Sequence, residues 1–113
     1  MTDKETQWKI QYTAKAREDL KDIVSYIADE LGEREIASLM FDSLTEGIRS
    51  LQTLPCRYPV YREEPWTSKG LHVMKIKKYF VFYYPVENQL TVNIIRIIYG
   101  GCDIRRQLSA TEL

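Results

Sequence analysis

Two stretches between residues 14 and 51 have the apolar spacing of amphipathic helices, and only a short break separates them. In the first stretch the predicted buried positions are Ala16, Leu20, Ile23, Val24, Ile27 and Leu31. In the second they are Ile36, Met40, Leu44, Ile48 and Leu51. Gly32 is suited to end the first helix and Pro55 to close the second. Because so few residues connect the helices, we expect an antiparallel hairpin whose apolar side must pack on another layer.

A strand-like segment precedes this hairpin. The segment "WKIQYT" (residues 8–13) alternates apolar and polar residues and places Trp8, Ile10 and Tyr12 on one side. Thr13 belongs to the residue types that cap helix N-termini. The strand is therefore expected to lead directly into the first helix.

Three further strands are predicted at residues 71–77, 79–85 and 90–99, with "VENQ" as the hairpin turn between the last two. Residues 54–70 contain three prolines and are predicted to form a loop. The segment "DIRRQL" (residues 103–108) is predicted to be a short terminal helix or turn. The expected fold class is α+β: a strand, the helical hairpin and three antiparallel strands, giving a four-stranded antiparallel sheet with the helices on one face.

The composition is that of a globular protein, with 44% hydrophobic and 28% charged residues. A chain of 113 residues is enough for one domain, which we place at residues 8–108, with tails at 1–7 and 109–113. No apolar run approaches the ~20 residues that cross a bilayer. The beginning "MTDKETQWK" lacks the apolar core of a secretory signal. We expect a cytoplasmic protein with no membrane partner.

The chain has two cysteines and one histidine. Cys56 and Cys102 lack C-x-x-C spacing and are predicted to be free thiols in a reducing compartment. Because His72 is the only histidine, a zinc site is not expected, and we expect no cofactor.

The net charge of zero conceals an uneven distribution. Residues 1–54 hold seven Lys and Arg against eleven Asp and Glu, a net charge of −4. Residues 55–113 hold nine against five, a net charge of +4. Two interpretations stay open: the second half contacts a polyanion, or the helices carry solvated carboxylates and the strand edges carry solvated lysines.

Five segments carry a family resemblance: "YTAKAREDLKDIVSYI", "IRSLQTLPCRYPVY", "EEPWTSKGLHVM", "YFVFYYP" and "IIRIIYGGCDIRRQL". In this order, over roughly residues 8–108, the chain resembles the RelE/ParE superfamily of toxins from bacterial type II toxin–antitoxin modules. It looks most like the ParE-like branch, whose members read close to "EEPW-S-GLR", "NY-VFY" and "RI-YGGRDI--QL". The resemblance implies a growth-inhibiting protein of the kind found in plasmid stabilisation, which a cognate antitoxin neutralises by wrapping it.

The resemblance implies one of two targets. RelE-like members cut messenger RNA on the ribosome, whereas ParE-like members poison DNA gyrase. Metal-independent RNA cleavage needs a general base, positive charge for the phosphorane and a proton for the leaving oxygen. At the positions where RNA-cleaving members usually carry arginine, this chain has Phe80 and Cys102. Whether the chain is an enzyme is therefore left open, and binding to gyrase is favoured.

If the chain is a nuclease, the candidate catalytic residues are Lys75, Lys77, Arg96 and Tyr99. Strand alternation predicts that Lys75 and Lys77 share a face, where they either hold phosphate oxygens or form a solvated edge. Arg96 is predicted on the same side as Ile94 and Ile98. It either stands in a functional groove or pairs with Asp103 or a helix carboxylate.

Four other residues are candidates for binding the target or the antitoxin: His72, Tyr83, Arg105 and Arg106. Each has an ordinary structural alternative, because a lone histidine on a strand, tyrosines in a sheet and arginines on a terminal helix are common. Gly100 and Gly101 are predicted to allow a positive-φ turn out of the last strand.

The strands "YFVFYY" and "VNIIRIIY" have two apolar faces, and two helices cover only one of them. We therefore expect the antitoxin to shield the other face, by groove docking or by an added strand. The predicted function is a gyrase-binding toxin held in check by an antitoxin. The alternatives are a ribosome-dependent endoribonuclease and a degenerate relative without toxicity.

Overall fold

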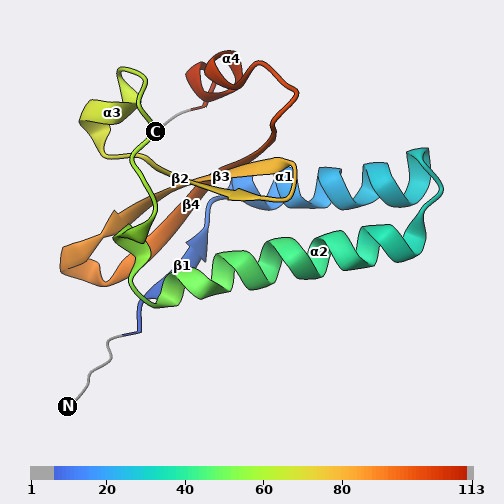
Figure 1. The fold of residues 1–113 in the computed structure, drawn as a ribbon, viewed down its shortest axis with the longest axis horizontal. Helices are drawn as coiled ribbons and strands as arrows, with labels where there is room; N and C mark the ends of the chain where they lie inside the picture. Colours follow the sequence, from blue (N-terminus) through green and yellow to red (C-terminus); the bar gives the residue numbers. More distant parts are fainter. Residues whose placement is uncertain (1–6, 112–113) are drawn as a thin grey trace.

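The computed structural model describes residues 7–111. Its strands and α-helices follow one another as β1 (Lys9–Tyr12), α1 (Ala14–Ser25), α2 (Arg34–Arg49), α3 (Trp66–Lys69), β2 (His72–Ile76), β3 (Tyr79–Val86), β4 (Thr91–Tyr99) and α4 (Ile104–Ser109). Three layers stack in Figure 1: the α1–α2 hairpin, the sheet, and a layer that holds α3 and α4. No helix in this part of the chain is long and apolar enough to span a membrane.

The predicted helical hairpin is confirmed. The Thr13 hydroxyl accepts a hydrogen bond from the Ala16 backbone N–H at 3.1 Å and so caps α1. The last turn of this helix widens into a π-helical turn, Tyr26–Glu30. Gly32 then adopts a left-handed conformation with φ of +67°, which reverses the chain into α2. The two helices lie side by side in Figure 1.

The fold class is α+β with a four-stranded sheet, as the sequence predicts, but the sheet is mixed rather than antiparallel throughout. The strand order is β1-β4-β3-β2, and β1 runs parallel to β4. The hairpin explains this direction because it returns the chain to the end of the sheet where β1 began. There the Trp8 N–H donates to the Gln52 carbonyl oxygen at 2.8 Å. β2 therefore runs the same way as β1, and after two reversals β4 does too.

The first core lies between the hairpin and the sheet. Its buried residues are Ala16, Leu44, Ile48, Leu51, Met74, Val81, Tyr83, Val92, Ile94 and Ile97. Ile10 and Tyr12 from β1 pack against it on the side that the alternation of residues 8–13 predicts. This core accounts for the apolar stripes of both helices near the sheet.

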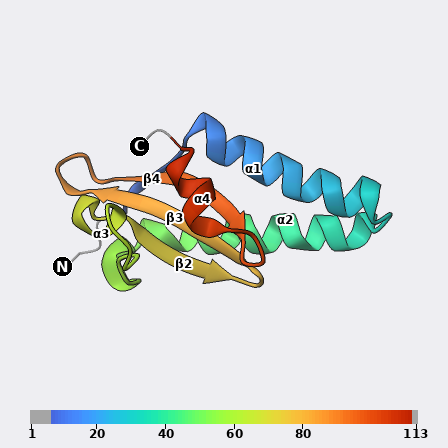
Figure 2. The same cartoon turned by 90° about the horizontal axis from the view of Figure 1, so that it is seen from above.

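The second face of the sheet is covered by the chain itself. Its buried residues are Trp66, Leu71, Phe82, Ile95, Ile98 and Leu108. The prediction that an antitoxin must shield this face is therefore wrong. The predicted loop 54–70 contains α3, which contributes Trp66, and the terminal helix α4 contributes Leu108. Figure 2 shows α4 lying across β3 and β4.

A bulge in β4 changes which side chains share a face. Tyr83 pairs with Ile94 and Phe82 pairs with Arg96, so Ile95 has no partner in the register. An extra residue shifts the alternation by one position. Ile94 consequently packs in the first core and Ile98 in the second, and the prediction that Arg96 shares a side with both is wrong.

The described chain continues past residue 108. Ser109 ends α4, and Thr111 contacts Arg96. Of the predicted tails 1–7 and 109–113, residues 1–6 and 112–113 lie outside the described residues.

Candidate functional site

Arg96 joins three elements below the surface, and only 5% of it is exposed. Its Nε and Nη2 donate to the two carboxylate oxygens of Asp19 on α1, at 2.6 and 3.1 Å. Its Nη1 donates to the Gln107 carbonyl oxygen at 3.1 Å and to the Thr111 hydroxyl at 2.7 Å. Of the two roles that the sequence leaves open, the structure shows the pairing with a helix carboxylate. Asp103 instead caps α4 by accepting from the Arg106 N–H at 3.3 Å.

The sheet topology explains why the Asp19 carboxylate is buried. β1 pairs with β4 only from Thr91 to Ile94, so the rest of that edge needs other partners. The Asp19 carboxylate accepts from the Ile97 N–H at 2.9 Å, and the Thr13 hydroxyl donates to the Ile94 carbonyl oxygen at 2.9 Å. Helix α1 and its cap residue thus supply hydrogen-bond partners to the edge of β4 where β1 does not.

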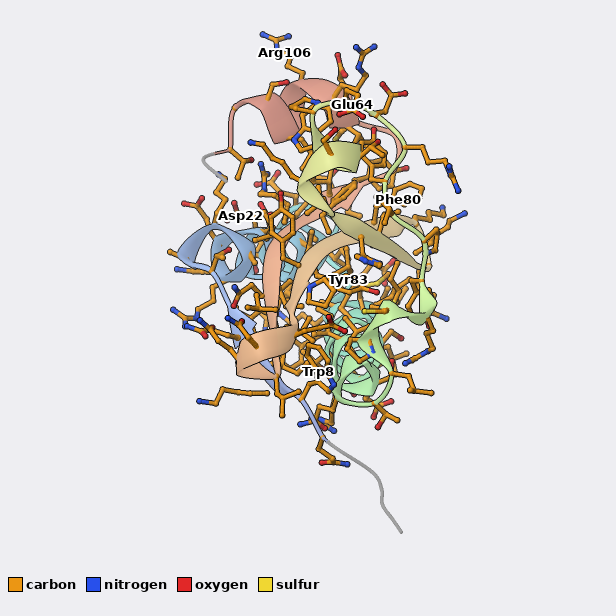
Figure 3. The ribbon with its side chains drawn as sticks, turned by 90° about the vertical axis from the view of Figure 1, so that its left-hand side faces the viewer. Trp8, Asp22, Glu64, Phe80, Tyr83 and Arg106 are labelled. Atoms are coloured by element: carbon orange, nitrogen blue, oxygen red, sulfur yellow. The ribbon has the colours of Figure 1, made fainter. Side chains whose placement is uncertain are left out.

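Two predicted binding residues make hydrogen bonds inside the chain, Tyr83 through its hydroxyl and His72 through one ring nitrogen. Tyr83 is fully buried and its hydroxyl donates to the Pro55 carbonyl oxygen at 2.6 Å. Burial raises the pKa of this hydroxyl, which therefore stays protonated as a donor. His72 Nδ1 donates to the Tyr58 carbonyl oxygen at 2.7 Å, and its ring stacks on Tyr83 at 5.4 Å. Figure 3 shows Tyr83 in the interior. The expectation that Tyr83 offers a binding surface is wrong.

A lysine-bearing depression remains at the surface, where β2 turns into β3 and β4 ends. Its volume is about 320 Å³, and its lining residues are Lys75, Lys78, Phe80, Tyr99, Gly100 and Gly101. The Lys75 ammonium lies 5.9 Å from the centroid of the Phe80 ring, within the range of a cation–π contact. We call these six residues the lysine shelf. Two of the four catalytic candidates, Lys75 and Tyr99, meet here.

Lys77 is not on a strand face. β2 ends at Ile76, and Lys77 has φ of +56° in the turn to β3. Because the turn breaks the alternation, the prediction that Lys75 and Lys77 share a face is wrong.

The paired glycines serve close packing. Neither has a positive φ, so the predicted left-handed turn is wrong. A Cβ at Gly100 would lie 2.8 Å from the Phe80 ring, and one at Gly101 would lie 2.5 Å from the Tyr99 ring. The glycines therefore let two aromatic rings lie against the end of β4, and these rings form the apolar part of the lysine shelf.

The remaining cationic candidates lie on α4. Arg105 and Arg106 are exposed, and Arg105 lies 3.5 Å from a carboxylate oxygen of Glu63. Figure 3 shows Arg106 pointing away from the molecule at the end opposite Trp8. Cys56 and Cys102 are exposed free thiols. Within residues 7–111, no three His, Cys, Asp or Glu side chains come together as metal ligands.

A larger groove, which the sequence patterns do not indicate, lies between the hairpin and the sheet. Its volume is about 660 Å³. Its lining residues are Asp22, Ile23, Tyr26, Ile27, Leu31, Glu33, Ile36, Lys78, Tyr79 and Tyr99. We call it the hairpin groove. Helical spacing predicted that Leu31 and Ile36 are buried, but both are exposed in this groove. Spacing along a helix does not show where the sheet that would bury these side chains ends.

The comparisons with known proteins agree with this architecture. The profile of the family described as the ParE toxin of the type II toxin–antitoxin system parDE matches residues 10–103. Most of the chain lies within that match, and the fold is that of the RelE/ParE superfamily of toxins. The chain belongs to the ParE toxin family of type II toxin–antitoxin systems, which confirms the resemblance.

Two solved structures share the fold. A chain of the chromosomal ParDE toxin–antitoxin system from P. aeruginosa has a TM-score of 0.67 and 20% identity, covering 83% of this chain and 97% of that one. A chain of the RelBE2 toxin–antitoxin complex from Mycobacterium tuberculosis has a TM-score of 0.60 and 20% identity, covering 87% and 97%. Among curated proteins, none matches significantly.

Proposed function

We propose that this toxin arrests growth by binding DNA gyrase through the lysine shelf, and that a cognate antitoxin neutralises it. The choice of gyrase over messenger RNA rests on which side chains lie in and next to the shelf. Phe80, packed against Gly100, occupies one position where RNA-cleaving relatives are expected to carry arginine. The other such position is the exposed Cys102. Arg96 is committed to Asp19 and supplies no charge at the surface.

The shelf has the chemistry of a protein-binding surface. Two lysines surround two partly exposed aromatic rings, Phe80 and Tyr99, and aromatic anchors contribute much of the binding free energy at protein interfaces. Lysines beside them favour a partner with negative charge. A binding toxin needs this shape and charge alone, whereas a nuclease also needs proton transfer and stabilisation of the phosphorane.

The target is tested by inducing the chain in cells and assaying the purified protein. We expect growth arrest, a DNA damage response, inhibited gyrase supercoiling and intact messenger RNA ends. Lys75→Glu is expected to weaken gyrase inhibition about tenfold, because it reverses the charge of a shelf residue. The matched control is Lys21→Glu, an exposed lysine on α1 outside the shelf, which should leave inhibition unchanged.

RNA cleavage is the second candidate, because Lys75, Lys78 and the Tyr99 side chain line one depression. Cuts within codons after induction, with normal supercoiling, would replace the gyrase proposal by this one. For the antitoxin, the small reading frame next to the toxin gene is co-expressed. We expect growth rescue and co-purification, and the proposal fails if no neighbouring product gives either.

The variant Cys102→Arg tests whether the chain is a degenerate relative. It restores a cation at an exposed position directly after Gly101. We expect the unaltered chain to be toxic already and the variant to gain no RNA cleavage, because the Phe80 position still lacks its arginine. Colony counts after induction, with RNA ends mapped in parallel, measure both. Toxicity confined to the variant would instead identify the natural chain as inactive.

A further inference from the structure

The helical hairpin is longer than the sheet that it covers. Ile76, the last residue of β2, packs against α2 at Gly47, where a Cβ would lie 2.5 Å from the Ile76 side chain. The stretch of α2 from Arg34 to Gly47 is about 20 Å of helix at 1.5 Å per residue. Figure 1 shows this part of the hairpin extending beyond the strands. The molecule therefore has a step, where the hairpin end (residues 22–36) projects past the end of the sheet.

The surface of this step is apolar. Among the described residues, eight large apolar side chains are exposed, and four of them line the hairpin groove: Tyr26, Leu31, Ile36 and Tyr99, at 56, 55, 49 and 45%. The first three belong to the hairpin end, and Tyr99 belongs to the sheet. Exposed apolar surface gathered in this way marks an interaction site.

The two sides of the step carry opposite charges. On the hairpin, residues 29–35, "DELGERE", hold four carboxylates and one arginine, a net charge of −3, and we call them the acidic turn. Asp22 adds a carboxylate on the hairpin side of the groove. On the sheet, residues 75–79, "KIKKY", hold three lysines and no carboxylate, a net charge of +3, and we call them the basic turn. Within residues 7–111, no ion pair joins the acidic turn to the basic turn.

A surface with this arrangement is complementary to a second copy of itself. When two hairpin ends stack on their apolar sides and point in opposite directions, the acidic turn of each copy meets the basic turn of the other. A two-fold axis across the hairpin ends relates the copies, so the contact closes as a dimer. Both charged contacts are then attractive. A partner with only one sign of charge would match one side of the step and oppose the other.

We propose that the free toxin forms a two-fold dimer through the hairpin groove. Tyr26, Leu31 and Ile36 pack on the hairpin end of the second copy, and the acidic turn of each copy faces the basic turn of the other. Because Lys78 and Tyr99 line both the groove and the lysine shelf, the dimer closes the shelf to the target. The dimer is independent of the proposed function, whereas the closure of the shelf rests on it.

Analytical ultracentrifugation of the purified toxin measures this assembly. We expect a monomer–dimer equilibrium with a micromolar dissociation constant and no larger species, because a two-fold contact closes. Ile36→Glu is expected to raise the dissociation constant about 100-fold, because each copy then places a charge in the apolar contact. Its control is Leu39→Glu, an exposed leucine on α2 that does not line the groove, and the expected change is less than about twofold.

An exchange of charges tests the two-fold arrangement. Glu33→Lys and Lys78→Glu, each alone, are expected to raise the dissociation constant about tenfold, because each weakens or reverses the attraction on both sides of the dimer. An equimolar mixture of the two variants is expected to dimerise as tightly as the unaltered toxin, because each altered charge then faces the opposite sign. The matched controls are Glu46→Lys and Lys21→Glu, exposed residues of the hairpin that do not line the groove. They should leave dimerisation unchanged, alone and mixed.

The closure of the shelf is tested with Ile36→Glu, which keeps every shelf residue. At a toxin concentration about ten times the dissociation constant, mass action leaves about one fifth of the unaltered chains monomeric. At that concentration Ile36→Glu is expected to inhibit gyrase about fourfold more strongly than the unaltered toxin, and far below it the two should be equal. Far-UV circular dichroism and urea midpoints establish that each variant is folded, and all the substituted positions are exposed.

The outcomes separate the dimer from the proposed function. A toxin that stays monomeric at every concentration overturns this inference and leaves the groove to a different protein. A dimer that Ile36→Glu and Leu39→Glu alter equally overturns the place of contact. Species larger than a dimer, or variants that mixing does not rescue, overturn the two-fold arrangement.

Gyrase inhibition decides the remaining point. If Ile36→Glu is monomeric but inhibits gyrase no better than the unaltered toxin at high concentration, the closure of the shelf is overturned and the dimer stands. If the unaltered toxin inhibits gyrase at no concentration, the proposed function fails, while the ultracentrifugation still decides the dimer.

Discussion

The variant Asp19→Ala is expected to lose about 3–5 kcal/mol of unfolding free energy, because it leaves the buried Arg96 guanidinium without its counter-charge. The loss extends to the sheet, since the Ile97 N–H then lacks its acceptor on the open edge of β4. Equilibrium unfolding in urea, followed by circular dichroism, measures the change. An isolated ion pair at the surface would have a far smaller effect.

The matched control is Glu18→Ala, which removes the neighbouring carboxylate on the same helix. Glu18 pairs with Lys15 at 2.8 Å, and both side chains are about half exposed. We expect no measurable change for this variant. Replacing Asp19 and Arg96 together by leucine and methionine should cost less than Asp19→Ala, because no buried charge is then left unpaired. Equal effects of Asp19→Ala and Glu18→Ala would show that the pair does not hold α1, β4 and α4 together.

The variant Leu108→Ala is expected to cost about 2–5 kcal/mol, because it removes a fully packed leucine from the second core. Leu108 is 1% exposed and lies in the cluster with Phe82 and Ile98. The loss should be seen in urea unfolding and also as faster amide exchange in α4. The result tests whether the chain's own terminal helix shields the second face of the sheet.

Arg106→Ala is the control for the terminal helix. Arg106 lies on α4 but points into solvent, so alanine, a good helix former, should leave stability unchanged. If Leu108→Ala is as stable as this control, α4 does not cover the sheet in solution. The second face would then again be available to a partner.

The elements themselves were largely predictable because their signals are local. The helical stripes, the Thr13 cap and the strand alternation each depend on residues a few positions apart. The cover on the second face was not predictable in this way. Trp66 lies in a proline-containing segment without periodicity, and nothing in the sequence indicated that this segment folds back over Phe82.

The candidate site was predictable only in part. Lys75 and Tyr99 do meet in the lysine shelf, whereas Lys77 lies in a turn and Tyr83 lies in the core. Burial separates Tyr83 from the shelf residues, whereas the turn after Ile76 separates the exposed Lys77 from them. Burial depends on what packs over each strand. A sequence that alternates correctly does not reveal which of its faces is covered.

The sequence by itself determined the family, the helical hairpin and the absence of arginine at Phe80 and Cys102, because identity and local periodicity are properties of neighbouring residues. Only the tertiary structure decided the role of Arg96, whose partner Asp19 is 77 positions away. It also decided that Leu31 and Ile36 line a groove, because the hairpin extends past the sheet. Contacts between distant residues follow from how the layers stack, and that is a property of the whole fold.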